Sequence, residues 1–214
     1  AAGWNAAEPG RVTSSTPAHH RIIEVGIVLL DGGEVVEQWS SLVNPGQRIP
    51  PLIENFTGIS NEMVADAPSF DDLRAEVRRR LAGRLFVAHN ARFDYGFVRN
   101  EFRRVGEKFA APVLGTVRLS RALFREHARH NLDTLIERYG LVCEARHRAL
   151  GDAAVLPPLL AAFESTAGRE QLQAVDLRAA GTDRDLEAVP AVGAFGERLV
   201  EAPVLRLRQP VGGE

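Results

Sequence analysis

Two aspartates and a histidine stand where helices are expected to begin, and these residue types could together cut a phosphodiester bond. Asp94 follows the apolar run "RLFVA" within "RLFVAHNARFDYGFV", and His147 stands five positions before Asp152 in "RHRALGDAA". Carboxylates are hard oxygen ligands that suit Mg²⁺ or Mn²⁺, and a histidine can take a proton from an attacking water. Asp94, Asp152 and His147 are therefore candidate parts of a divalent-metal phosphodiesterase site.

Each of these residues also has an ordinary structural interpretation. An aspartate in the first turn of a helix favours the helix dipole, which alone would account for Asp94 or Asp152. A lone histidine such as His147 is more often a surface or hydrogen-bonded side chain. We expect His89 to hold the loop before Asp94, and Phe93 to belong to the core. Only the combination of these residues in this order favours catalysis.

The elements that would position these residues alternate in type along the chain. Residues 21–30 and 34–43 are β-branched and apolar runs joined by "DGG", which is a hairpin signal. Residues 69–83 begin with a serine cap and two first-turn acids and end in glycine, so a helix is expected there. Short apolar strands and helices then follow in alternation, and a kink or break is expected at Pro157 and Pro158. This order predicts a mixed α/β sheet with helices on its faces.

Composition restricts the class of protein. The chain has 214 residues and a net charge of −2, so it gains no overall electrostatic attraction to phosphate. Arg78, Arg79 and Arg80 are interpreted as a solvated helix face. The single cysteine, Cys143, cannot form an internal disulfide or a cysteine metal cluster. Because the sequence shows neither a membrane-spanning run nor signal-peptide features, we expect a cytoplasmic protein with no membrane partner.

The ordered motifs resemble one known family. The blocks "RIIEVGIV", "LVNPGQRIP", "FTGISNEMV", "FVAHNARFDYGFVRNEF" and "HRALGDA" stand at distances similar to those of the DEDDh 3′-to-5′ exonucleases. These are the DnaQ-like group, which includes the proofreading epsilon subunit of DNA polymerase III. The resemblance covers most of the chain, from Pro17 to Phe163. It implies a ribonuclease-H-like fold, a mixed sheet flanked by helices.

The resemblance also implies roles for individual residues. Asp94 and Asp152 would be metal ligands, and His147 would be the general base in a hydrolysis that uses two Mg²⁺ or Mn²⁺ ions. The implied partner is a DNA 3′ end, single-stranded, with a DNA polymerase subunit as a second candidate. The residues implied to bind substrate are His89, Asn90 and Phe93.

One block of the family is not found in this sequence. Two of the family's four acids come from an apolar strand followed by Asp-x-Glu-Thr-Thr-Gly, just before "RIIEVG", where this chain has "AAEPGRVTSSTPAHH". In one register the acid positions fall on Gly10 and Val12. In the other they fall on Pro9 and Arg11. The first strand is therefore expected to be absent or degenerate, and Glu24 in the next strand is interpreted as structural.

The missing pair of acids has a chemical and a structural consequence. Asp94 and Asp152 alone should bind metal weakly and leave transition-state charge unstabilised, so we expect little or no nuclease activity. The missing strand is central in the family's sheet. Its neighbours are expected either to keep unpaired edges or to pair with a substitute segment.

Two functions and one domain plan follow. The leading hypothesis is a metal-dependent 3′-to-5′ exonuclease acting on DNA 3′ ends in proofreading or repair, by descent if not by present activity. The alternative is a non-catalytic module that binds nucleic acid or a polymerase, and the sequence leaves DNA against RNA open. The plan has an atypical N-terminal segment over 1–16, an exonuclease-like domain over 17–164, and a tail or linker of unknown role over 165–214.

Overall fold

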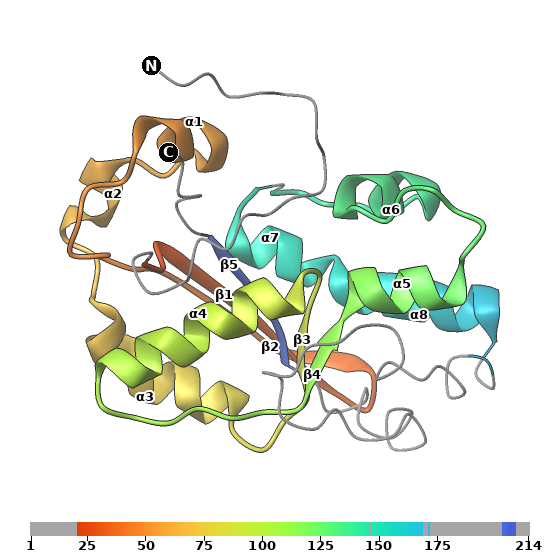
Figure 1. Cartoon of the computed structure of the whole chain (residues 1–214), viewed down its shortest axis with the longest axis horizontal. Helices are drawn as coiled ribbons and strands as arrows, with labels where there is room; N and C mark the ends of the chain where they lie inside the picture. The colour runs from red at the N-terminus through yellow and green to blue at the C-terminus, as the bar shows by residue number, and fades with distance from the viewer. Residues whose placement is uncertain (1–20, 146, 169–170, 172–202, 209–214) are drawn as a thin grey trace.

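The fold is built around a five-stranded sheet. The computed structural model of the chain describes residues 21–145, 147–168, 171 and 203–208 (Figure 1). The strand order is β2-β1-β5-β3-β4, in which β1 is antiparallel to β2 and β5, and β3 is parallel to β4 and β5. The strands are β1 (Glu24–Asp31), β2 (Glu34–Leu42), β3 (Phe86–Ala88), β4 (Val113–Gly115) and β5 (Pro203–Arg208).

Helices pack on both faces of this sheet. Side chains alternate between the two faces of a strand. The helices of the described residues are α1 (Pro51–Thr57), α2 (Asn61–Ala65), α3 (Phe70–Leu81), α4 (Ala91–Arg104), α5 (Thr116–Leu123), α6 (Leu132–Arg138), α7 (Ala149–Ala154) and α8 (Leu156–Ala167). In β1, Ile27 and Leu29 pack in one core with α3 and α4, whereas Val28 and Leu30 pack in a second core with α5, α6 and α8.

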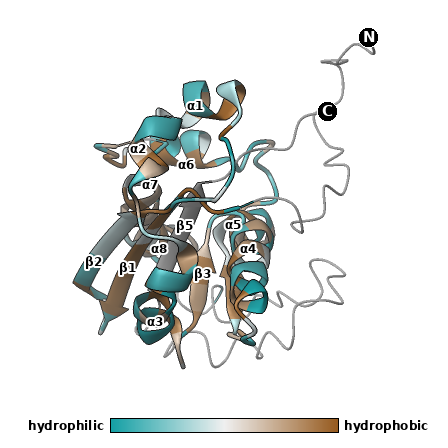
Figure 2. Cartoon of the chain, turned by 90° about the vertical axis from the view of Figure 1, so that its left-hand side faces the viewer, coloured by the Kyte–Doolittle hydropathy of each residue, from teal (hydrophilic) through white to brown (hydrophobic). Residues whose placement is uncertain are grey.

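Local sequence accounts for several of these elements. The predicted hairpin is confirmed, with β1 buried and apolar and β2 more hydrophilic (Figure 2). Ser69 and Asp72 form a reciprocal capping box at the start of α3, as the sequence predicts. The predicted break is also confirmed, because α7 ends at Ala154 and α8 begins at Leu156 with proline in its first turn. Within the described ranges, no helix is both long and apolar enough to cross a bilayer.

The central strand of the sheet comes from the far end of the chain. Residues 203–208, which the sequence places in a tail of unknown role, form β5 between β1 and β3. Leu205 pairs with Ile27 in an antiparallel ladder, and Val204 pairs with Val87 in a parallel one. The expected gap in the sheet is therefore filled by a substitute segment. The predicted domain limits stay a prediction, and the N-terminal segment 1–16 lies outside the described residues.

Removal of β5 is expected to unfold the domain. A chain that ends at Gly168 would leave the inner edges of β1 and β3 without ladder partners, and unpaired buried backbone groups are costly. We predict that this chain loses its cooperative thermal transition in circular dichroism. A control chain that ends at Arg208 keeps β5 and should melt as the full chain does. Equal melting of the two truncated chains would contradict the placement of β5.

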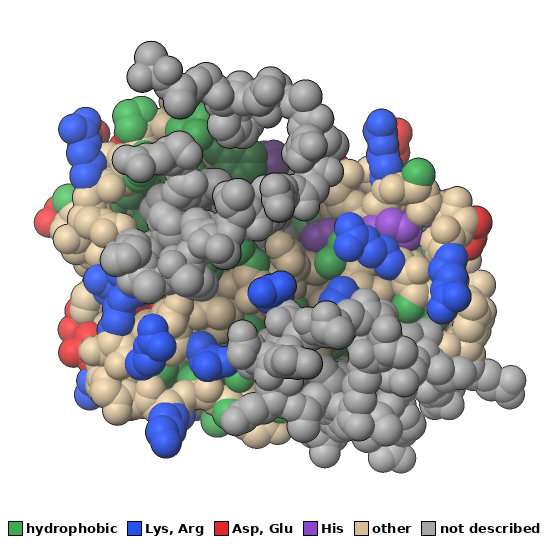
Figure 3. Space-filling model, in the orientation of Figure 1, with side chains coloured by type: hydrophobic (Ala, Val, Ile, Leu, Met, Phe, Trp, Pro, Cys, Tyr) green, Lys and Arg blue, Asp and Glu red, His purple; other side chains and the backbone are tan. Residues whose placement is uncertain are grey.

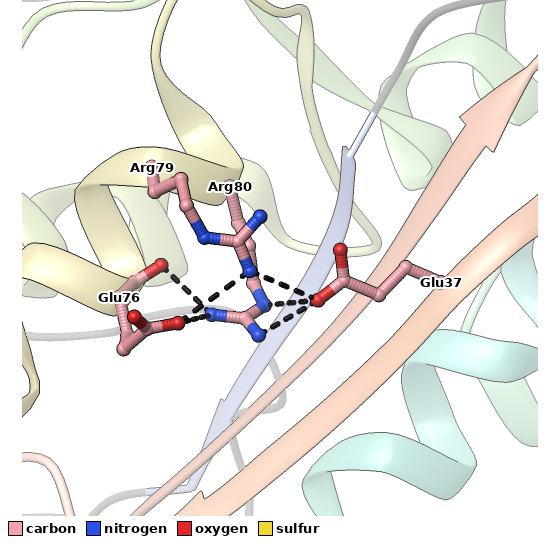
Figure 4. Close-up of polar contacts among 4 residues, drawn as sticks. All are labelled: Glu37, Glu76, Arg79 and Arg80. Carbon is pink, nitrogen blue, oxygen red and sulfur yellow. Dashed lines mark hydrogen bonds and ion pairs between the residues drawn. The ribbon is translucent and has the colours of Figure 1, made fainter.

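An ion-pair cluster joins α3 to the edge strand β2. Figure 4 shows Arg79 and Arg80 of α3 reaching Glu37 of β2, with Glu76 on the same helix. The Glu37 carboxylate lies 2.7 Å from Arg80 Nη2 and 3.2 Å from Arg79 Nη2. Arg80 is buried, and its guanidinium lies 4.4 Å from the ring centroid of Trp39. The interpretation of residues 78–80 as a solvated face is therefore wrong for Arg80, because it meets an acid and an aromatic ring of β2.

The cluster predicts a pH-dependent contribution to stability. Burial raises the pKa of Glu37, but the hydrogen bond from Arg79 and the charge of Arg80 outweigh it, so the pKa lies below its usual 4.5. A carboxylate with a lowered pKa stabilises the fold above its unfolded-state pKa and loses this effect as the pH falls through its folded pKa.

We predict that Glu37→Gln is less stable than the wild type by up to about 1 kcal/mol at pH 6, since the pair is partly exposed. The difference should shrink below pH 4.5. Thermal melts over a pH series would measure it. Glu34→Gln is the matched control, because Glu34 is exposed on the same strand and has no ion pair among the described residues. A difference that grows as the pH falls would contradict this account.

Candidate active site

The first candidate acid lies where β3 passes into α4. β3 ends at Ala88, Asn90 is the N-cap residue of α4, and Asp94 lies in the first turn of that helix. The Asp94 side chain is buried, with 1% of the residue exposed. A carboxylate near a helix N-terminus is favoured by the helix dipole, which offsets part of the cost of its burial. The short connection thus places a buried acid beside the centre of the sheet.

His89 fastens this connection to the next helix. Its Nδ1 lies 2.9 Å from the hydroxyl oxygen of Thr116, and its carbonyl oxygen accepts a hydrogen bond from the backbone N–H of Val117. Both side chains of the His89–Thr116 pair are buried. His89 therefore ties the end of β3 to the start of α5, as the structural interpretation expected. A contact of His89 or Asn90 with substrate stays a prediction.

Phe93 differs from its expected place in the core. Phe93 is 40% exposed, whereas Tyr95 and Phe97 on the same helix are buried. The interpretation of Phe93 as a core residue is wrong. Its ring lies 5.0 Å, centroid to centroid, from that of the buried Phe97, one turn further along the same helix face, but Phe93 is in the first turn of α4 and stays partly exposed there. An exposed aromatic ring is available to a ligand. The implied contact with substrate therefore stays a prediction for Phe93.

The second candidate acid lies in α7, next to the candidate base. Asp152 is fully buried in the first turn of α7, and its Oδ1 accepts a hydrogen bond from the backbone N–H of His147 at 3.4 Å. His147 has a φ of 69°, a left-handed conformation that few non-glycine residues adopt. The structure thus brings His147 and Asp152 together as a turn closed by the acid itself.

Phe56 lies beside the candidate base, although its place in the sequence does not mark it as a site residue. Its ring lies 4.9 Å from the imidazole of His147, centroid to centroid, and the side chain is exposed at the end of α1. Leu52 and Met63 are also exposed on α1 and α2. Phe56 belongs to the block "FTGISNEMV", which resembles the family, but nothing in the sequence indicates that this block lies next to His147.

Both acid-bearing helices pack against the central strand. α4 and α7 each contact β5, and α7 also contacts β1. The residues of β5 are Pro, Val, Leu, Arg, Leu and Arg, so this strand supplies no carboxylate. Within the described residues, no three His, Cys, Asp or Glu side chains gather in a group that could hold a metal ion. The described residues therefore do not fit a complete two-metal centre, although Asp94 and Asp152 are of the right chemical type.

The backbone of α7 rests directly on β1. A Cβ added to Gly26 of β1 would lie 2.3 Å from the backbone nitrogen of Leu150, and one added to Gly151 would lie 2.1 Å from the carbonyl oxygen of Ala145. Real Cβ atoms do not come so close to backbone atoms, so neither position has room for a side chain. Gly26 therefore lets the start of α7 lie close against β1, and Gly151 lets the preceding loop at Ala145 lie close against α7.

A methyl group at Gly26 should displace α7. We predict that Gly26→Ala lowers the free energy of unfolding by about 1–3 kcal/mol, because the helix backbone must move. Gly115→Ala is the matched control, since a Cβ there would meet its nearest neighbour at an ordinary 3.5 Å. We expect Gly115→Ala to cost less than about 1 kcal/mol. Chemical denaturation would measure both, and an equal cost would contradict the close approach of α7.

Positive side chains do not gather on the visible described surface of one face. Figure 3 shows Lys and Arg side chains dispersed singly over this part of the molecule. On the described part of this face, binding of a polyanion would therefore depend on local groups and not on a broad basic patch.

The chain is similar in sequence to known exonucleases and to part of a DNA polymerase. The exonuclease family model matches residues 12–158. The 3′-5′ exonuclease DinG of Bacillus subtilis is 41% identical over 138 residues, which are 63% of this chain and 15% of that protein. The PolC-type DNA polymerase III of Bacillus cereus is 34% identical over 141 residues, which are 65% of this chain and 10% of that protein. The chain thus spans a small part of the length of these relatives.

Solved structures agree in fold. Exonuclease X in complex with 5′ overhanging duplex DNA matches with a TM-score of 0.58 and 25% identity, over 74% of this chain and 90% of that one. A 3′-exonuclease that recognises the histone mRNA stem-loop matches with a TM-score of 0.59 and 18% identity, over 75% of this chain and 61% of that one. The predicted ribonuclease-H-like fold class is confirmed.

Proposed function

Because this chain belongs to the exonuclease family, in its DnaQ-like group, we propose that it acts at DNA 3′ ends as a 3′-to-5′ exonuclease of low activity. The observation that carries the proposal is the pair of buried aspartates. Asp94 and Asp152 lie in the first turns of α4 and α7, two helices that both pack against the central strand. Buried carboxylates are costly to a fold, and they are typical of sites where their charge has a use.

The proposed roles follow from the environment of each residue. His147 stands two residues before the start of α7, and its backbone N–H donates a hydrogen bond to Asp152, so the two residues are held next to each other. In this position we assign His147 as the base that accepts a proton from water. Asp94 and Asp152 offer oxygen ligands to Mg²⁺ or Mn²⁺. Since the described residues do not complete a metal centre, hydrolysis is proposed to be slow.

A DNA 3′ end is the proposed substrate. The match with exonuclease X covers 90% of that chain, and that structure is a complex with 5′ overhanging duplex DNA. The exposed rings of Phe93 and Phe56 suit stacking on unpaired bases, which is worth about 1–3 kcal/mol per base. Because the ring of Phe56 contacts that of His147, a nucleobase stacked on Phe56 would lie close to the proposed general base.

A second candidate function is a non-catalytic module that binds nucleic acid ends or a polymerase. The composition of β5 favours it, because the central strand that meets both acid-bearing helices has two arginines and no acid. The likeness to part of a PolC-type polymerase makes association with a polymerase the partner to test. Such a module would bind nucleic acid without a need for divalent metal.

An oligonucleotide assay separates the two functions. The purified chain is incubated with a 5′-labelled single-stranded DNA in Mg²⁺ or Mn²⁺, and binding is followed in parallel by fluorescence anisotropy. We predict slow, stepwise shortening from the 3′ end. Asp152→Asn should lower the rate by about 100-fold, since it removes one charge from the site.

Asp133→Asn is the matched control, because Asp133 is a first-turn aspartate of α6 outside the site. This variant should cut as the wild type does. Binding by wild type and Asp152→Asn alike, with no cutting by either, would support the non-catalytic module. A chain that neither binds nor cuts the DNA would contradict both functions.

A further inference from the structure

A glutamate of β1 lies beneath the start of α7. Glu24 is buried, and its Oε2 accepts a hydrogen bond from the backbone N–H of Ala149, the first residue of α7, at 2.7 Å. Its Oε1 accepts two further bonds from Arg148, at 2.9 Å from Nε and 2.6 Å from Nη2. Both carboxylate oxygens are therefore committed to the two residues that begin the helix.

These bonds replace a cap that α7 lacks. Arg148 is the N-cap residue of α7 and makes no side-chain cap hydrogen bond. The first backbone N–H groups of a helix need an acceptor, and a negative charge there is also favoured by the helix dipole. Glu24 meets both needs from a neighbouring strand. The start of α7 is thus fixed to β1 by a charge-assisted pair and not by its own sequence.

The fixed residues lie within the proposed site. His147 directly precedes Arg148, and Asp152 is four residues after it, one turn along the same helix. Gly26, two residues after Glu24, lets the backbone of α7 touch β1. Loss of the Glu24–Arg148 pair would therefore shift His147 and Asp152 before more distant residues.

We propose that Glu24 is a positioning residue, which sets the place of His147 and Asp152 by capping α7 and holding Arg148. This inference rests on the proposed function, because the positions of His147 and Asp152 matter for activity only if these residues act on a DNA 3′ end. Glu24 itself is turned to Arg148 and Ala149 and is assigned no contact with the substrate.

The chain contains a matched control for this role. Glu101 of α4 is as buried as Glu24, is paired with Arg21 at 2.9 Å and with Arg104 at 2.9 Å, and accepts a backbone N–H from Ile22 at 3.3 Å. Like Glu24, Glu101 is therefore bonded to arginine side chains and to a backbone N–H. Its partners do not belong to the proposed site. Loss of its charge should cost stability only.

The test compares Glu24→Gln with Glu101→Gln in the full chain, below the melting temperature of both. Hydrogen exchange of the amides of 149–154 is measured, together with the affinity for a single-stranded DNA oligonucleotide. We expect Glu24→Gln to speed exchange in 149–154 and to weaken DNA binding, each about tenfold. Glu101→Gln should leave both within about twofold while lowering the melting temperature.

Each outcome decides the proposal. If Glu24→Gln does not fold, Arg148→Gln breaks the same pair from the side that is 42% exposed, and the same two changes are expected. Arg148→Lys keeps the charge and should restore part of the DNA affinity. Unchanged exchange in 149–154 would overturn the positioning role. If Glu24→Gln speeds exchange in 149–154 but the wild type does not bind the oligonucleotide, the positioning of α7 by Glu24 is supported and the proposed function is rejected.

Discussion

A strand in the middle of a sheet needs hydrogen-bond partners on both of its edges. The arrangement of the sheet and of the helices packed on its central strand depends on this requirement. The inner edges of β1 and β3 are joined by β5, whose residues Pro203–Arg208 lie beyond the region 12–158 that the family model matches. Buried backbone groups left without partners are costly, so some segment must take this place. In this chain the segment comes from the far end of the sequence. The two acid-bearing helices then pack on it.

This constraint accounts for the arrangement of the candidate site among the described residues. The elements on either side of β5 place Asp94 and Asp152 in the first turns of their helices, and the closeness of α7 to β1 depends on Gly26. These features belong to the strands and helices that flank the centre. The chemistry of the centre depends on which segment fills it, and β5 brings no acid. The strands and helices around the centre thus hold the two candidate acids, whereas the central strand β5 adds none.

Local patterns in the sequence predicted the frame well. The hairpin, the capped helix at Ser69 and the break before Pro157 each depend on residues that are close in sequence, so they could be read directly. The order of the motifs around Asp94 and Asp152 identified the family for the same reason. Both aspartates proved to be buried, which a first-turn acid need not be.

The features that sequence reasoning missed depend on contacts between distant segments. β5 is a short run among scattered glycines and prolines, and only its pairing with Ile27 and Val87 makes it central. Arg80 is one of three adjacent arginines, and only the approach of Glu37 and Trp39 from β2 buries it. No periodicity carries such information, because each contact exists only once the sheet has formed.

Nuclear Overhauser contacts across the sheet test the central claim most directly. The placement of β5 predicts backbone contacts of Leu205 with Ile27 and of Val204 with Val87 in the full chain. Observation of both contacts would establish that the C-terminal strand closes the centre of the sheet. Contacts from the inner edges of β1 and β3 to any other segment, with residues 203–208 in neither ladder, would contradict the account.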